Sequence, residues 1–349
     1  MKKIAVILFN LGGPASLGEV RGFLFALFND PAIINLPQPL RFLVASLISR
    51  RREKTAQAIY AQLGGRSPIL ENTAAQAKAL EAELNRSGGA SYKCFMSMRY
   101  ALPRSADTMR AVENFAPDEI VLLPLYPQFS TTTTASSFKD WEKAAQQSWL
   151  KAPTKSICCY PDEAGFIQTV AQLTRAAIEK ASPHGKPRIL FSAHGLPEKI
   201  IRAGDPYATQ CGQTVRALAA ELGLAEQDYV LCYQSRVGPL KWIGPATDDE
   251  IRRAGKDRVP LVVVPVAFVS EHSETLVEID RDYRHLAQES GVPFFVYAGT
   301  AGTAPEFIAG LAGLVQKARA NESCISGAAA RTCGPEFTGC CRNKVAHAL

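Results

Sequence analysis

Two short segments of this sequence contain residue types that can move protons or bind a divalent metal ion. In the first, His194 ends an apolar run and Gly195 follows it directly, so the chain can turn away. In the second, Glu271 and Glu274 follow another apolar run, where a helical pattern begins. Because the carboxyl ends of parallel strands meet at one edge of a sheet, we expect the imidazole and a carboxylate to lie close together. Such a pair can accept protons or handle a divalent metal.

Structural roles for these side chains are also open. A strand-end histidine can simply hydrogen-bond a carbonyl, and the macrodipole favours acids in a first helical turn. An acidic stripe at helical spacing is formed by Glu271, Glu274, Glu278 and Asp282. Either the stripe is a solvated helix face, or it binds cations transiently. The spacing of the acids is compatible with both explanations.

The cysteines are concentrated near the C-terminus. Four of the nine, Cys324, Cys333, Cys340 and Cys341, fall within 18 residues of a Gly-rich, loop-like stretch. Such density is hard to explain by core packing, and thiols in a reducing compartment favour metal ligation over disulfides. The sequence therefore predicts a thiolate metal site in the tail.

Several other function classes lack their motifs. There is no G-x-G-x-x-G, G-K-[ST] or G-x-S-x-G, so nucleotide binding and α/β-hydrolase chemistry are unsupported. His272-Ser273-Glu274 matches half of a zinc deaminase signature, but the P-C-x-x-C half is missing. The net charge of +6 comes from 39 basic and 33 acidic residues that are mixed along the chain, so we expect no nucleic acid partner.

The beginning of the chain predicts a buried strand rather than an export signal. Its apolar run, Ile4–Phe9, is only six residues long, and no small-residue cleavage site follows. No stretch reaches 18 apolar residues, so no spanning helix is expected. We expect a cytoplasmic protein, and nothing in the sequence indicates its oligomeric state.

Short apolar runs alternate with helical patterns up to about residue 318, which predicts an α/β fold with a doubly wound parallel sheet. The expected strands are Ile4–Phe9, Lys93–Met98, Glu119–Leu125, Ser156–Tyr160, Arg188–Ser192, Tyr229–Tyr233, Val259–Phe268 and Phe294–Ala298. The expected helices are Asn72–Leu84, Ala106–Phe115, Gly165–Ala181, Tyr207–Leu222, Glu274–Ala287 and Pro305–Ala320.

The first three and the last five strands form two groups, which predicts two similar Rossmann-like lobes. We place the first lobe at residues 1–150 and the second, with His194 and Glu274, at 151–320. The last helix is expected to pack back on the first lobe. Residues 321–349 form a cysteine-rich tail.

Over roughly residues 3–320 the sequence resembles the ferrochelatase family. The segments that carry the resemblance are NLGGP at 10–14, GRSP at 65–68, MRY at 98–100, LPLYPQFS at 123–130, SAHGLP at 192–197, QSRVGP at 234–239, WIGP at 242–245 and FVSEHSETL at 268–276. Their order and number make the resemblance specific. It implies two Rossmann-like lobes with a porphyrin cleft between them, and the insertion of Fe²⁺ into that porphyrin.

The resemblance also implies roles for single residues. His194 and Glu274 would bind the substrate iron and remove the pyrrole protons, in an order that the sequence leaves open. The residues that would line the porphyrin site are Asn10, Arg99, Tyr100, Tyr126, Ser130 and Trp242. Among them, Arg99 suits a propionate and the aromatic side chains suit the porphyrin face.

Two further features follow from the same resemblance. Residues 36–52, apolar at first and basic at the end, would be either a core helix or a mobile apolar lip in peripheral contact with the inner face of the membrane. The tail would hold a [2Fe–2S] cluster, with Cys333, Cys340 and Cys341 as ligands and Cys158 preferred over Cys159 from the body. Thr131 stands where animal relatives have a cysteine ligand, and zinc on four thiolates is the alternative.

The expected activity is thus the insertion of Fe²⁺ into protoporphyrin IX to form protohaem, the last step of haem biosynthesis. One alternative is coproporphyrin III, whose four carboxylates would need more cationic groups; the apolar lip favours protoporphyrin. Another is a haem-binding or haem-transfer module without turnover, which an intact His194 and Glu274 argue against.

Overall fold

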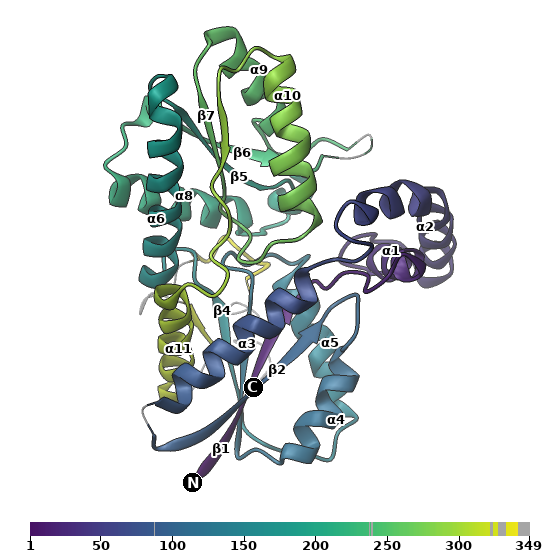
Figure 1. The fold of residues 1–349 in the computed structure, drawn as a ribbon. Helices are drawn as coiled ribbons and strands as arrows, with labels where there is room; N and C mark the ends of the chain where they lie inside the picture. Colours follow the sequence, from purple (N-terminus) through teal and green to yellow (C-terminus); the bar gives the residue numbers. More distant parts are fainter. Residues whose placement is uncertain (87, 237, 239, 322–323, 327–332, 341–349) are drawn as a thin grey trace. The chain divides into compact units, whose positions relative to one another are not determined.

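We describe a computed structural model of the chain, which covers residues 1–86, 88–236, 238, 240–321, 324–326 and 333–340. It divides into two compact units. The first consists of Met1–Leu125, Ser130–Cys158 and Val315–Cys324, and the second contains the described residues of Tyr126–Phe129, Cys159–Leu314 and Ile325–Leu349. The described part of the chain contains two sheets, one with strands mainly from the first unit and one with strands from the second (Figure 1).

The first sheet has the strand order β2-β1-β3-β4-β9. Its strands are β1 (Lys2–Asn10), β2 (Ala90–Met98), β3 (Glu119–Pro124), β4 (Thr154–Cys159) and β9 (Ile325–Ser326). The five residues from Ile4 to Leu8 are completely buried, as expected for a central parallel strand that is covered on both faces. Burying each large side chain contributes about 1.5–3 kcal/mol, so β1 anchors the unit.

The helices of the first unit are α1 (Val20–Phe28), α2 (Gln38–Ala61), α3 (Ile69–Arg86), α4 (Ser105–Phe115) and α5 (Thr134–Gln146). Val20 and Leu24 of α1 form a small cluster with Tyr60 of α2. The segment 36–52 lies mostly in α2. Five of its large apolar side chains are exposed, namely Leu36, Leu40, Phe42, Leu43 and Leu47. A core helix is excluded for this segment.

The second sheet has the order β6-β5-β7-β8, with β5 (Arg188–His194), β6 (Tyr229–Gln234), β7 (Leu261–Pro265) and β8 (Phe295–Tyr297). Its helices are α6 (Ala164–Ala181), α7 (Glu198–Arg202), α8 (Tyr207–Leu222), α9 (Thr247–Asp257), η4 (Glu274–Tyr283) and α10 (Arg284–Glu289). The last helix, α11 (Pro305–Ala320), begins with a proline at a position where no backbone donor is needed.

The structure confirms the parallel α/β class and contains every predicted strand, but it changes two assignments. Strand β4 pairs with β3 through Leu122 and Ser156, so it belongs to the first sheet and the expected grouping of the last five strands is wrong. The helix expected over Glu274–Ala287 is wound as a π-helix for its first ten residues and becomes α-helical only at Arg284. Such π segments are rare and are frequently found at functional sites.

No helix in the described ranges is long and apolar enough to cross a membrane.

Candidate active site

His194 is the last residue of β5, a central strand of the second sheet. Its Nδ1 lies 2.7 Å from the Gly195 carbonyl oxygen. Because a carbonyl only accepts, Nδ1 carries the proton in the neutral ring and Nε2 keeps a free lone pair. A Cβ on Gly195 would lie 2.9 Å from the Gln234 carbonyl oxygen and 3.3 Å from the Trp242 ring, so this close turn requires glycine.

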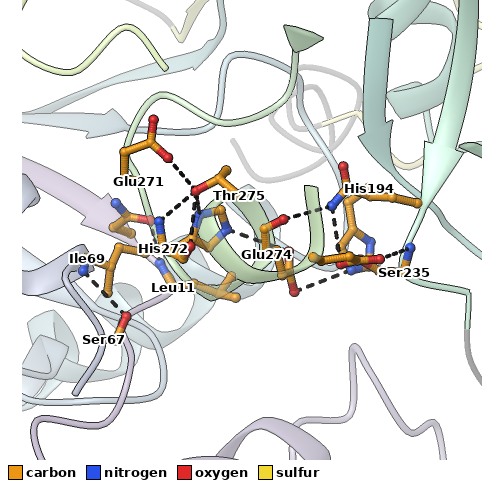
Figure 2. A network of polar contacts seen from close by, with 12 residues as sticks. Leu11, Ser67, Ile69, His194, Ser235, Glu271, His272, Glu274 and Thr275 are labelled. Carbon is orange, nitrogen blue, oxygen red and sulfur yellow. Dashed lines mark hydrogen bonds and ion pairs between the residues drawn. The ribbon is translucent and has the colours of Figure 1, made fainter. Parts of the chain in front are cut away.

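Glu274, the first residue of η4, faces two imidazoles (Figure 2). Its Oε1 lies 3.7 Å from His194 Nε2, and its Oε2 lies 3.6 Å from His272 Nε2. The side chains of His194 and Glu274 are each about one-third exposed, at 34% and 33%. A substrate can therefore reach both groups.

The charge of Glu274 is set by competing effects. Burial alone would raise the pKa of this carboxyl group, but the electrostatic interaction with His194, a hydrogen bond with His272 and the electrostatic interaction with His272 lower the pKa to about 2. Glu274 is thus a carboxylate at any physiological pH. It can attract a cation or stabilise a proton on a neighbouring ring.

This pKa shift predicts a pH-dependent contribution to stability. A folded pKa of about 2, below the ordinary value of 4.5, means that ionised Glu274 stabilises the fold above about pH 4.5 and loses this effect as the pH falls toward 2. We expect the difference in unfolding temperature between the wild type and Glu274→Gln to be constant from pH 7 to pH 5 and to shrink below pH 4.5. A difference that grows on acidification would contradict the assignment.

Two other acids of the stripe are bonded within the second unit. Glu271 accepts hydrogen bonds from the Tyr297 hydroxyl at 2.9 Å, from Thr300 N at 3.0 Å and from the Thr275 hydroxyl at 2.6 Å, and so fixes the chain just before η4. Burial, followed by the charge of Glu271, raises the pKa of Tyr297.

Glu278 binds the end of β6. It accepts from Ser235 N at 2.9 Å, from the Ser235 hydroxyl at 2.5 Å and from the Tyr283 hydroxyl at 3.1 Å. Burial, followed by the charge of Glu274, raises the pKa of Glu278. Only Asp282, about half exposed beside Arg281, fits the explanation of a solvated helix face.

A strand-end imidazole with a free nitrogen beside a permanent carboxylate matches the proton and metal chemistry expected for this edge of the sheet, and sequence comparison supports the same activity. The ferrochelatase family profile matches residues 3–319. The ferrochelatase of Caulobacter vibrioides (strain NA1000 / CB15N) is 51% identical over 344 residues, covering 98% of both chains. The ferrochelatase of Phenylobacterium zucineum (strain HLK1) is 56% identical over 313 residues, covering 89% of this chain and 90% of that one.

This chain belongs to the ferrochelatase family. As a ferrochelatase it is a lyase that inserts iron into a porphyrin. Among solved structures, SirB from Bacillus subtilis with Fe³⁺ covers 92% of this chain and 97% of its own, with a TM-score of 0.55 and 12% identity. That likeness shows that the ferrochelatase chain shares the chelatase fold.

The ferrochelatase site includes one residue to which the sequence reasoning gave no role, His272. It is the second imidazole on Glu274, and it also packs against the Phe268 ring at 4.6 Å between centroids. The H-x-E spacing of His272 and Glu274 was the available signal. Taken alone, that spacing matches half of a zinc deaminase signature.

The residues that the ferrochelatase resemblance assigned to the porphyrin fall in both units. Asn10, Arg99, Tyr100 and Ser130 belong to the first, whereas Tyr126 and Trp242 belong to the second. The Asn10 amide donates to the Thr73 hydroxyl at 3.0 Å, and the Ser130 and Thr132 hydroxyls lie 2.8 Å apart. Asn10, Tyr100, Tyr126 and Ser130 are buried, so contact between these four side chains and the substrate stays a prediction.

Arg99 of this ferrochelatase contacts an acid within its own unit. Its guanidinium pairs with Asp30 at 2.7 Å and with Asp140 at 3.5 Å, and the Tyr100 hydroxyl donates to Asp30 at 2.9 Å. Asp30 follows α1 and is 2% exposed. The arginine therefore fastens the end of α1 to the sheet, and its binding of a propionate stays a prediction.

We expect Asp30→Asn to destabilise the first unit by about 3 kcal/mol, because breaking a buried ion pair leaves an uncompensated charge. The measurement is the free energy of unfolding in urea. Asp140→Asn is the matched control, since Asp140 is more exposed and lies farther from Arg99. Equal effects of the two substitutions would show that Asp30 is not the main anchor.

Of the tail cysteines, Cys333 and Cys340 lie in the second unit, whereas Cys324 belongs to the first. Gln210 Nε2 donates to Cys159 Sγ at 3.3 Å and to Cys333 Sγ at 3.1 Å. A hydrogen bond with Cys340, then burial and nearby Cys159, raise the pKa of Cys333. Cys158 and Cys324 are also buried.

Cys341 lies outside the described residues. Within the described part of the chain, no group of three or more His, Cys, Asp or Glu side chains is arranged to hold a metal ion. The tail thiols therefore do not form a completed site with the described residues alone.

Proposed function

We propose that this ferrochelatase inserts Fe²⁺ into protoporphyrin IX to form protohaem, and that His194 and Glu274 carry the reaction. The supporting observation is the free Nε2 of His194 beside the Glu274 carboxylate. Iron insertion replaces two pyrrole N–H protons by one Fe²⁺ and involves no change of oxidation state. The site therefore needs a proton acceptor and a group that attracts the cation.

His194 Nε2 is the acceptor in this proposal. A pyrrole proton that moves to Nε2 makes an imidazolium, and the Glu274 carboxylate 3.7 Å away stabilises that charge. Glu274 stays ionised because its pKa is about 2, so it also attracts Fe²⁺. The imidazolium then passes its proton to solvent, and Nε2 is ready for the second pyrrole proton.

The choice of protoporphyrin over coproporphyrin is supported by the apolar exposure of α2. Leu40, Phe42 and Leu43 are 54%, 50% and 63% exposed, which suits a porphyrin with two carboxylates better than one with four. The test is an anaerobic assay of Fe²⁺ insertion into each porphyrin. A higher kcat/KM for coproporphyrin III would overturn the substrate, and consumption of neither porphyrin would overturn the enzyme.

We further propose peripheral contact of α2 with the cytoplasmic face of a membrane. Exposed Leu40, Phe42, Leu43 and Leu47 are followed by the exposed cations Arg50, Arg51 and Arg52. Apolar side chains beside cations favour an anionic lipid surface. Sedimentation with anionic vesicles should therefore exceed sedimentation with neutral ones, and a charge substitution such as Leu43→Glu should reduce it.

The tail thiols are proposed to hold a [2Fe–2S] cluster. The donors suit it, because Cys159, Cys333 and Cys340 are buried thiols and Cys341 follows Cys340 directly. Cys159 and Cys333 both accept a hydrogen bond from Gln210, and Cys333 is hydrogen-bonded to Cys340. When bound, the cluster would supply an electron-transfer or sensing group apart from iron insertion. Iron and acid-labile sulfide analysis with an absorption spectrum tests this. A colourless protein with one zinc per chain would contradict it.

A further inference from the structure

Gln210 is a buried carboxamide whose orientation is fixed. It lies on α8 and has no exposed surface. Its Oε1 accepts the backbone N–H of Phe129 at 2.7 Å. Because that N–H can only donate, the carboxamide cannot be turned around, and Nε2 with its two hydrogens must point the other way.

Nε2 donates to two sulfur atoms, Cys159 Sγ at 3.3 Å and Cys333 Sγ at 3.1 Å. A neutral thiol is a weak acceptor, so burying an amide donor against two thiols recovers little of its lost hydration. A thiolate sulfur accepts a stronger, charge-assisted hydrogen bond. The arrangement is therefore matched to sulfurs that carry negative charge, as metal-bound thiolates do.

The same contact distinguishes the two adjacent body cysteines. Cys158 and Cys159 are neighbours in β4, so their side chains point to opposite faces of the strand. Gln210 bonds Cys159 and thereby places its sulfur on the side of Cys333. This favours Cys159 as the body ligand, against the choice of Cys158 made from the sequence.

The tail is also fastened to the loop that precedes α8. Gly339 N donates to the Gly204 carbonyl at 3.1 Å, and the Thr338 hydroxyl donates to the Ala203 carbonyl at 3.3 Å. Gly204 has a φ of +89°, and a Cβ there would lie 2.5 Å from the Thr338 hydroxyl oxygen. Direct hydrogen bonds of the protein thus hold the tail next to Gln210.

We propose that Gln210 is the positioning residue of the tail metal site. It pairs Cys159 and Cys333 as ligands, and its two N–H groups raise the reduction potential of the bound cluster by stabilising the more negative reduced form. This inference rests on the proposed tail cluster. It adds the identity of the body ligand and a residue outside the ligand set.

The test compares purified wild type with Gln210→Met and Gln210→Glu. Both variants lose the N–H donors, whereas Glu keeps an acceptor for Phe129 N, so a shared effect reports on the donors rather than on packing. We expect roughly tenfold faster loss of iron to a chelator, guided by the usual effect of residues that support metal ligands, and a lower reduction potential. The control is Gln128→Met, because Gln128 is equally buried but bonds Thr214 and Val266 instead.

Single cysteine variants decide the body ligand. Cys159→Ser should lose the visible absorption and Cys158→Ser should retain it, and the reverse result would overturn the pairing. A cluster whose potential and chelator sensitivity are unchanged in both Gln210 variants would overturn the inference and leave the cluster proposal standing. If the wild type holds zinc, the cluster proposal fails, and the rate of zinc loss to a chelator still tests Gln210.

Discussion

Replacing His194 with alanine is expected to lower the rate of iron insertion by about 100-fold or more while leaving the fold intact. The His194 imidazole can accept a proton at this edge of the sheet. Its Nδ1 is held by the hydrogen bond to the Gly195 carbonyl, so its Nε2 keeps a lone pair that faces the site. General bases typically contribute two to four orders of magnitude. The measurement is initial-rate formation of haem under anaerobic conditions, with the unfolding temperature recorded for both proteins.

The fold should survive because the His194 side chain is 34% exposed and makes no core contact comparable to that of Phe191, three residues earlier on β5. His285→Ala is a matched control, since His285 is 72% exposed and pairs with Glu289 on α10. Activity of His194→Ala above about a tenth of the wild type, with a normal control, would remove His194 from the chemistry.

The strands could be predicted from the sequence because each is a short apolar run with a turn signal at its end, as Ile4–Phe9 shows. Their assignment to sheets could not. The pairing of β4 with β3 depends on a register between Ile120–Leu122 and Thr154–Ser156 that leaves no local pattern. A boundary drawn at the proline-containing segment before β4 therefore separated strands that the hydrogen bonds join.

The site could be predicted in part, because some of its residues follow directly from the positions of the predicted strands and helices. His194 ends β5 and Glu274 begins η4, the helix that follows β7, so the order of the strands in the sheet alone brings the two side chains together. The more distant partners of Glu271 and Glu278 could not be found, because Tyr297, Thr300 and Ser235 come from segments well separated in the sequence. The π winding of η4 was also missed, since its apolar spacing fits an ordinary α-helix.

Glu274 and Glu278, two acids of η4, are expected to respond differently when each is replaced by glutamine. Glu274→Gln should reduce the rate of iron insertion about 100-fold or more, because the variant loses the charge that stabilises protonated His194 and attracts Fe²⁺. Its unfolding temperature at neutral pH should fall only by the contribution of the ionised carboxylate, which is weakened because the side chain is one-third exposed. Initial rates and unfolding temperatures of the same preparations are the measurement.

Glu278→Gln should have the opposite profile. Glu278 accepts from Ser235 N, the Ser235 hydroxyl and the Tyr283 hydroxyl, and a glutamine places a donor where one of its oxygens accepted. Leaving buried donors unsatisfied costs about 1–3 kcal/mol, so the unfolding temperature should fall while the rate falls less than in Glu274→Gln. Asp282→Asn, on the exposed part of the stripe, should change neither quantity.

The comparison separates three roles. Equal and small rate losses in Glu274→Gln and Glu278→Gln would mean that the stripe has no part in the chemistry. A large rate loss in Glu278→Gln with an unchanged unfolding temperature would instead assign proton transfer to Glu278, whose pKa is raised by burial and by the charge of Glu274. The expected pattern, a rate effect at Glu274 and a stability effect at Glu278, follows from one carboxylate facing two imidazoles and the other facing hydrogen-bond donors of the protein.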